Sequence, residues 1–349
     1  MNDDARWMGA AITLATRARG RTSPNPNVGC IIVHQGRVVG RGLTADGGRP
    51  HAEAVALTQA GETARGATLY TTLEPCAHAS ERGPTCSDLI VEAGLSRVVI
   101  AVRDPDSRTD GNGIARLHDA GIDVVEDVET AAATRAMAGF LTRQRLGRPH
   151  VTLKLALSLD GCIARADGES QWITGAEARA HGHLERSRAE AILVGRGTLE
   201  ADAPRLDVRL AGLEGRSPKR YILSTTRTAC PELVEGSSVS GLSLEIKDRA
   251  STSSAKTEWG VVYSPNDITT LPTDHLLIEG GAQTASAFLR ADLVDRILIY
   301  RAPILIGGGK PALHDIGLTA LSDAHGRWRA VDSRMLGKDR LDIYERVRD

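Results

Sequence analysis

Apolar residues in the first half of the chain follow two kinds of pattern. One predicted helix has apolar residues at helical spacing, at Trp7, Ala11, Leu14, Ala15 and Ala18. Short apolar runs predict buried strands at 28–33, 68–73, 97–102 and 122–125. Further helices are expected from near residue 51, from residue 86 and over 113–120. Strands that alternate with helices in this way indicate an α/β fold with a three-layer sheet.

The second half repeats this alternation after a basic linker that contains glycine and proline. Its strands are expected at 150–156, 162–164, 191–194, 276–278, 297–303 and 341–347. Two of them run into glycine turns that precede a helix, Gly195-Arg196-Gly197-Thr198 and Glu279-Gly280-Gly281. Backbone amides at the start of a helix can bind a pyrophosphate, so two such turns are compatible with a dinucleotide. A plain strand-to-helix turn would also explain each of them.

Length and composition suggest two domains in a globular protein. A chain of 349 residues is long enough for two hydrophobic cores, and the linker divides it into 1–146 and 147–349. The tract 229–254 is rich in Ser, Thr and Glu and has no sustained period, which predicts a polar surface insertion in the second domain.

Charge and hydropathy exclude several kinds of partner. The formal net charge is −1 and only 3% of the residues are aromatic, which argues against a nucleic-acid partner. No apolar run approaches about 20 residues, so we expect no membrane partner. The acidic start lacks a secretory segment and the five cysteines do not form a disulfide framework, so a cytoplasmic location is expected.

The strongest chemical signal is one imidazole, two thiols and one carboxylate in a fixed order. His51-Ala52-Glu53 is followed by Pro75-Cys76 and then by Cys86. Three such ligands leave the fourth position of a tetrahedral zinc open to water, as in a catalytic site. Bound zinc lowers the pKa of that water towards about 7. Glu53 can then move protons without ligating the metal, which matches the signature of zinc nucleobase deaminases.

The spacing within this motif sets two geometric conditions. The signature usually ends in Cys-x-x-Cys, whereas nine residues separate Cys76 from Cys86, so the intervening loop must double back. Residues i and i+2 of a helix point about 200° apart, so His51 and Glu53 cannot share one flank of a helix. A metal bound by His51 and close to Glu53 must therefore lie beyond the helix end. A structural zinc domain joined to a nucleotide-binding module is an alternative, but that reading needs a fourth protein ligand.

Longer motifs resemble the bifunctional riboflavin-biosynthesis deaminase/reductase family. In the first half they are Ser23-Pro24-Asn25-Pro26-Asn27-Val28-Gly29, His51-Ala52-Glu53 and Thr72-Leu73-Glu74-Pro75-Cys76 with His78. The resemblance implies a cytidine deaminase-like three-layer domain with one zinc per chain on His51, Cys76 and Cys86. It also implies that Glu53 transfers the proton, and it places substrate contacts at Asn25, His78 and Arg82.

The second half resembles the reductase part of the same family, which is similar in fold to dihydrofolate reductase and uses NADPH. The matching motifs are Lys154-Leu155-Ala156 with Ser158-Leu159-Asp160-Gly161, and Gly168-Glu169-Ser170-Gln171-Trp172-Ile173-Thr174. The implied cofactor contacts are Ala156, Trp172, Thr198, Asp202, Thr225, Gly281, Ala282, Gln283, Thr284, Ala285, Ser286 and Ala287. The implied substrate contacts are Ser170, Arg186, Leu206, Arg209 and Glu279. Either arginine could instead be an ordinary surface charge.

The chain departs from the family at two positions. Thr44 stands where relatives often have a histidine. Ala203 stands where they have the second aspartate of Ala-Asp-Asp-Pro, so a carboxylate of the hydride-transfer site is missing. We therefore expect the reductase to use Lys154 or water as its proton donor.

The expected function is a two-step conversion of a phosphorylated pyrimidine. The first domain would hydrolytically deaminate a diaminopyrimidinone that carries a phosphoribosylamino group, and the second would reduce its ribosyl chain to ribityl with NADPH. We expect a small-molecule substrate and a homo-oligomer. A nucleoside or tRNA base deaminase is the alternative enzyme, although a fused reductase has no role in that reaction.

Overall fold

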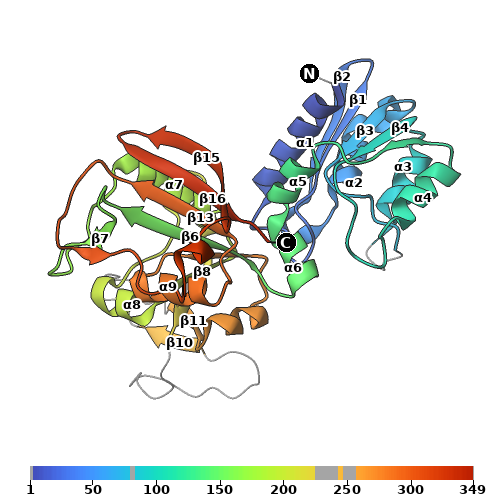
Figure 1. Ribbon diagram of the computed structural model, residues 1–349. Coiled ribbons are helices and arrows are strands. Elements are labelled where there is room, and N and C mark those ends of the chain that lie inside the picture. Colours follow the sequence, from blue (N-terminus) through green and yellow to red (C-terminus); the bar gives the residue numbers. More distant parts are fainter. Residues whose placement is uncertain (1–2, 79–82, 225–242, 247–256, 349) are drawn as a thin grey trace. The chain divides into compact units, whose positions relative to one another are not determined.

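The computed structural model describes residues 3–78, 83–224, 243–246 and 257–348. The chain folds as two compact units, Met1–Arg148 and Pro149–Asp349 (Figure 1). Each unit contains one main β-sheet with helices packed against it, which confirms the predicted α/β class. Among the described residues no helix is both long enough and apolar enough to span a bilayer.

The first unit is built on a five-stranded sheet in the order β2-β1-β3-β4-β5. The strands are β1 Gly29–His34, β2 Arg37–Leu43, β3 Thr68–Thr71, β4 Arg97–Ile100 and β5 Asp123–Val125. β1 is antiparallel to both of its neighbours, whereas β3, β4 and β5 are parallel. The segments that follow β3 and β4 therefore leave the sheet at the same edge.

Helices cover both faces of this sheet. They are α1 Asp3–Ala18, α2 Ala52–Ala60, α3 Cys86–Glu92, α4 Asn112–Asp119, α5 Thr130–Ala136 and α6 Ala138–Leu146. Gly29 faces the backbone of α1, and Gly42 of the neighbouring strand faces the backbone of α2. Gly42 pairs with Cys30, the residue after Gly29, so the two helices lie on opposite faces. This is the three-layer arrangement predicted from the sequence (Figure 1).

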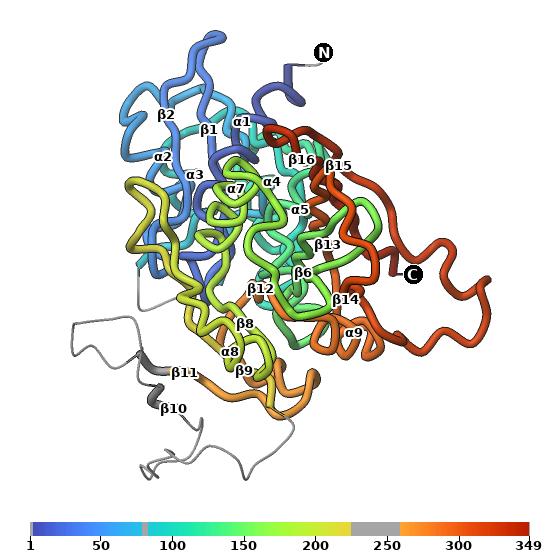
Figure 2. Tube along the Cα trace, turned by 90° about the vertical axis from the view of Figure 1, so that its left-hand side faces the viewer, coloured from blue at the N-terminus to red at the C-terminus, as the bar shows by residue number. Residues whose placement is uncertain are grey.

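The second unit is built on a nine-stranded sheet in the order β10-β11-β9-β8-β12-β6-β13-β16-β15. These strands are β6 His150–Leu157, β8 Ala191–Gly195, β9 Lys219–Leu223, β10 Ser243–Ile246, β11 Thr257–Val262, β12 His275–Ile278, β13 Arg296–Arg301, β15 Trp328–Leu336 and β16 Asp339–Arg346. The run from β11 to β13 is parallel, and the strands beyond each end of it pair antiparallel. β13, β16 and β15 lie side by side at one end (Figures 1 and 2).

The helices of the second unit are α7 Ala176–Arg186, α8 Arg196–Asp202 and α9 Ala282–Arg290, and a separate small sheet joins β7 Cys162–Ala164 to β14 Lys310–Pro311. α8 and α9 begin directly after the carboxyl ends of β8 and β12, which are neighbouring parallel strands. Within the predicted insertion 229–254, β10 pairs with the edge of β11. Four residues are too short to register as a periodic pattern, so the sequence did not reveal this strand.

Candidate active sites

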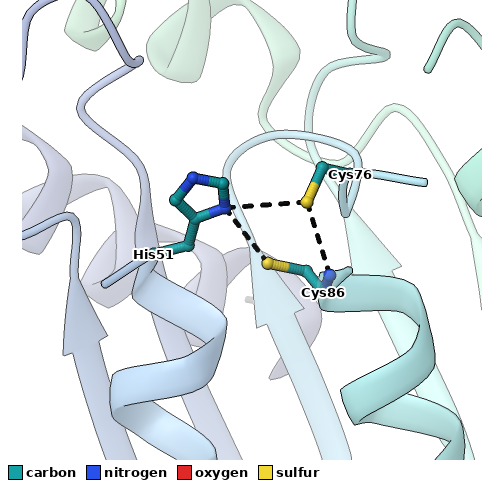
Figure 3. A group of neighbouring side chains, drawn as sticks. All are labelled: His51, Cys76 and Cys86. Atoms are coloured by element: carbon teal, nitrogen blue, oxygen red, sulfur yellow. Dashed lines mark hydrogen bonds between the residues drawn. The ribbon is translucent and has the colours of Figure 1, made fainter. Parts of the chain in front are cut away.

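Three side chains from separate elements of the first unit meet at the edge where β3 and β4 end. His51 is the N-cap of α2 and has an extended backbone, with φ −70° and ψ 159°. Cys76 lies in the loop after β3, and Cys86 is the first residue of α3. Their ligating atoms all lie within 4.8 Å of one another (Figure 3). The predicted set is therefore brought together, and the metal position lies beyond the end of α2.

The geometry of this donor set fits zinc. His51 Nδ1 lies 3.3 Å from the sulfur of Cys86 and 3.6 Å from the sulfur of Cys76. A tetrahedral zinc places nitrogen and sulfur ligands about 3.5 Å apart. The loop between the cysteines doubles back as the spacing requires, because the Cys86 backbone N–H donates to the Cys76 sulfur at 3.3 Å. The Ser87 backbone N–H then donates to the carbonyl of Cys76.

The two thiols differ in acidity. A hydrogen bond from Cys86 lowers the pKa of Cys76 well below its usual value, and His51 contributes in the same direction. The same bond raises the pKa of Cys86, and burial raises it further. Metal ligands bind in their deprotonated forms, so a cation held by both sulfurs would displace any thiol proton.

Glu53 lies beside the donor set and is 3% exposed. One carboxylate oxygen is 3.0 Å from the hydroxyl of Thr71, and the other is 3.5 Å from the sulfur of Cys86. Burial raises the pKa of Glu53, and the nearby His51 partly opposes this rise. A carboxyl with a raised pKa beside an open ligand position suits proton transfer at neutral pH.

Of the three substrate contacts predicted for the first unit, two lie among the described residues. The Asn25 side-chain amide donates to the carbonyl of Gly48 and lies 3.3 Å from Nε2 of His51. His78 follows Cys76 in the same loop, and its Nδ1 is 3.3 Å from the hydroxyl of Thr109. Arg82 lies outside the described residues. Thr44, which replaces the family histidine, is buried and bonds to Pro26 and Val28, so it braces the turn that carries Asn25.

The structure adds a carboxyl group that the sequence interpretation missed. Asp104 follows β4, and therefore leaves the sheet at the same edge as the Cys76 loop. Burial raises its pKa to about 6, and the nearby carboxylates of Asp106 and Glu74 add to the effect. The parallel order of β3 and β4 was the available signal, because it places the segments after both strands at one edge.

In the second unit, Lys154, Glu279 and Arg186 form one partly buried charged cluster. Arg186 donates to both oxygens of Glu279, at 2.7 and 3.0 Å, and Lys154 lies 3.5 Å from the second oxygen. Burial alone would raise the pKa of Glu279, but the two cations lower it to about 2. Glu279 is therefore an anion at neutral pH and holds the ammonium group of Lys154 at the carboxyl edge of the parallel sheet.

The other substrate contacts predicted for this unit lie in two segments, of which one is bonded to the cluster. Arg186 also donates to the carbonyl of Asp207 at 3.0 Å, which ties the segment containing Leu206 and Arg209 to α7. Leu206 is buried and has a positive φ of 52°. The side chain of Arg209 is 51% exposed and lies 3.4 Å from the Asp207 carboxylate. Ser170 is half-buried in the segment between β7 and α7.

A cavity of about 560 Å³ opens where α8 and α9 begin. Six of the predicted cofactor contacts line it, namely Thr198, Gly281, Ala282, Gln283, Thr284 and Ala287. The Gly281 backbone N–H lies 3.3 Å from the hydroxyl of Thr198, which joins the two glycine turns. A side chain at Gly195 would meet the Thr284 hydroxyl at 2.3 Å, so close packing of the turns requires glycine there. Arg196, Lys310 and His314 also line the cavity and were not predicted.

The remaining predicted cofactor contacts lie elsewhere. Ala285 is fully buried in the core, and Ser286 accepts a hydrogen bond from the backbone N–H of His314; neither residue lines this cavity. Trp172 is 64% exposed and stacks under the guanidinium of Arg179. Ala156 lies on β6 and Asp202 lies at the end of α8, and neither residue lines the cavity. Thr225 lies outside the described residues.

Comparisons with known proteins support the two-part reading of the chain. Residues 1–102 match the family model for the cytidine and deoxycytidylate deaminase zinc-binding region, and residues 149–341 match that for the RibD C-terminal domain. The riboflavin biosynthesis protein RibD of Escherichia coli is 37% identical over 359 residues, which cover 96% of this chain and 97% of that protein. RibD of Mycobacterium tuberculosis is 40% identical over 340 residues, covering 96% and 95%.

Solved structures agree over nearly the whole length. Acinetobacter baumannii RibD superposes with a TM-score of 0.81 at 34% identity and 99% coverage of both chains. A diaminohydroxyphosphoribosylaminopyrimidine deaminase/5-amino-6-(5-phosphoribosylamino)uracil reductase from Thermotoga maritima gives 0.82 at 31% identity, again covering 99% of both chains. This chain therefore belongs to the RibD family of riboflavin-biosynthesis proteins, in which a zinc-binding deaminase domain is followed by an NADPH-dependent reductase domain.

Proposed function

We propose that the chain deaminates a diaminopyrimidinone carrying a phosphoribosylamino group and then reduces the ribosyl chain of the product to ribityl. The observation that carries this proposal is the His51, Cys76 and Cys86 donor set with the buried Glu53 carboxyl beside it. A three-ligand set with an adjacent proton carrier suits hydrolysis better than a purely structural metal role.

In the deaminase unit, His51, Cys76 and Cys86 would hold a zinc ion, which would supply a water molecule activated for attack at neutral pH. Glu53 accepts a proton from that water and returns one to the amine that leaves as ammonia, so the ring carbon exchanges an amino group for a carbonyl oxygen. The hydroxyl of Thr71 holds the Glu53 carboxyl in place during both transfers. Asn25 and His78 bind the pyrimidine, and Arg82 binds its phosphate group in this proposal.

In the reductase unit, bound NADPH would supply the hydride. Thr198 and the amides at the start of α9 would hold the cofactor in the cavity between the two glycine turns. Lys154 donates the proton that accompanies hydride transfer to the open-chain sugar, and Glu279 orients that lysine through an ion pair at 3.5 Å. Ser170, Arg186, Leu206 and Arg209 surround the ribosyl phosphate in this proposal.

The test separates the two activities in the purified full-length chain. The Glu53→Gln variant should retain one zinc per chain, lose ammonia release by about 10²-fold or more, and still reduce the pre-formed deaminated substrate at the wild-type rate. Ammonia release, NADPH oxidation and zinc by elemental analysis are the three measurements. Wild-type protein without either activity would refute the proposal.

Cys76→Ser is the matched control, because it removes a ligand and should abolish both zinc binding and ammonia release. If Glu53→Gln also lost zinc, Glu53 would be a fourth ligand of a structural site. The expected homo-oligomer and cytoplasmic location belong to the same proposal. Light scattering on the purified protein and fractionation of producing cells test these two points.

A further inference from the structure

Glu74 is a buried carboxylate whose partners are all backbone amides. It is 2% exposed and lies two residues before the zinc ligand Cys76. One of its oxygens accepts hydrogen bonds from the N–H groups of Asp104 and Gly111, at 3.2 and 3.0 Å. The other accepts from Gly113 and Ile114, at 3.0 and 3.2 Å. One side chain therefore fixes both ends of the 104–114 segment.

The 104–114 segment also packs directly against the loop that carries Cys76, through Gly113 near its carboxyl end. A Cβ atom at Gly113 would lie 2.1 Å from the carbonyl oxygen of Pro75 and 3.1 Å from the Glu74 carboxylate. Only glycine allows this approach, so the segment rests directly on the peptide that precedes Cys76. The four amide bonds and this contact set the distance between the segment and the ligand loop.

The same segment supplies a polar contact to the candidate substrate site. Thr109 is fully buried, and its hydroxyl lies 3.3 Å from Nδ1 of His78. Its backbone N–H donates to the carbonyl of Asp106, which closes a turn within the segment. With Nδ1 of His78 directed at Thr109, the other ring nitrogen is the one available to a substrate. The position of the segment thus determines how the imidazole of His78 is presented.

We propose that Glu74 is a positioning residue of the deaminase, which acts through the 104–114 segment and Thr109 on the ring of His78. This inference rests on the proposed deaminase function and assigns Glu74 no contact with substrate or metal. The zinc ligand Cys76 has separate supports, namely the N–H of Cys86 on its sulfur and the N–H and hydroxyl of Ser87 on its carbonyl. Loss of Glu74 should therefore disturb substrate binding and leave zinc bound.

Glu74→Gln tests the proposal with little change in volume. The amide keeps one acceptor oxygen but turns an NH2 group towards two backbone N–H donors, so two of the four bonds are lost. We expect KM for the pyrimidine to rise roughly tenfold, because small displacements of a positioning group weaken productive binding. The zinc content and the reductase rate should be unchanged. The kcat of deamination should stay within about twofold of the wild-type value.

Thr109→Val removes only the hydroxyl contact to His78 and keeps the whole Glu74 brace. We expect it to raise KM in the same direction with wild-type thermal stability, so it decides the matter even if Glu74→Gln fails to fold. Glu62→Gln changes an exposed carboxylate of the same unit and is the matched control.

A purely structural brace gives a different pattern. In that case Glu74→Gln lowers the melting temperature but leaves KM unchanged in assays run well below it, and Thr109→Val has no effect on KM. Either unchanged KM would overturn the proposal. Absence of deamination in the wild-type protein would instead refute the proposed function, so the two failures are distinguishable.

Discussion

Gly42 provides a sharp test of how the first zinc ligand is placed. It lies on β2, buried under α2, and a Cβ atom there would be 1.9 Å from the carbonyl oxygen of Ala52 and 2.8 Å from the backbone nitrogen of Ala56. Both are backbone atoms of a helix, so no side chain can rotate away. Ala52 lies between the ligand His51 and the proton carrier Glu53.

The displacement caused by Gly42→Ala follows from these distances. Ordinary contact begins at 3.4 Å, so the first turn of α2 must retreat by about 1.5 Å from its present 1.9 Å contact. Metal sites tolerate ligand displacements of only about 0.2 Å. Overpacking of this kind also costs about 1–3 kcal/mol of stability. We therefore expect loss of zinc and of ammonia release, with a melting temperature lower by roughly 3–9 °C.

Two other glycines separate displacement of the ligand from general destabilisation. Gly29→Ala places its Cβ atom 2.0 Å from the carbonyl of Ala11, so it displaces α1, which carries no ligand. It should lower stability to a similar extent and keep zinc. Gly9→Ala meets nothing within 4 Å and should be neutral or stabilising.

The measurements are zinc per chain, ammonia release, NADPH oxidation and the melting temperature of each variant. NADPH oxidation reports on the second unit and should be normal in all three. The reasoning would be refuted if Gly42→Ala kept a full complement of zinc. It would equally be refuted if Gly29→Ala lost zinc as completely as Gly42→Ala.

Two further predictions concern carboxyl groups. Burial raises the pKa of Asp104 from 3.8 to about 6, so its ionised form destabilises the folded protein fully above pH 6 and progressively less as the pH falls towards 3.8. Asp104→Asn should raise the free energy of unfolding by about 1–2 kcal/mol near pH 8, after allowance for solvent screening, and by less near pH 5. Thermal melts at the two pH values measure this gain, and equal gains at both would contradict the prediction. Ala203 caps α8 with a left-handed φ of 40°, which aspartate tolerates, so Ala203→Asp should fold normally and leave NADPH oxidation unchanged. Lys154→Met should abolish that oxidation, and a tenfold gain in Ala203→Asp or an active Lys154→Met would refute the Lys154 hypothesis.

The zinc ligands could be predicted because their chemistry is written in residue types. His51, Cys76 and Cys86 are distinctive residues. His51 and Cys86 lie at the starts of helices, and Cys76 lies in the loop that follows an apolar strand. The role of Glu74 could not be predicted, although the motif containing it was recognised. Its partners are backbone amides about 30 to 40 residues further along the chain, and a backbone amide leaves no mark in the sequence.

Some elements of the second unit were missed because they bury few apolar side chains. α7 buries only Ala178, Gly182 and Glu185. β15 lies at the edge of the sheet and is exposed along most of its length. Hydrophobic periodicity reports burial on one face, so it cannot detect a helix or strand whose position is set by turns, ion pairs and backbone pairing.

The charged cluster of the reductase shows a related limit. Sequence alone suggests that an arginine near a phosphorylated substrate binds phosphate, and this stays a prediction for Arg186. In the structure its guanidinium already makes three hydrogen bonds, two to Glu279 and one to the carbonyl of Asp207. A buried carboxylate requires cationic partners, because an unpaired charge is costly away from water. Arg186 therefore balances the charge of Glu279, and with Lys154 the three groups retain one net positive charge. That remaining charge lies where Lys154 is held, so the cluster can attract an anionic substrate without a phosphate displacing Glu279 from Arg186. The side chain of Arg209 is 51% exposed and lies 3.4 Å from the Asp207 carboxylate, so of these two arginines it is the more open to a phosphate.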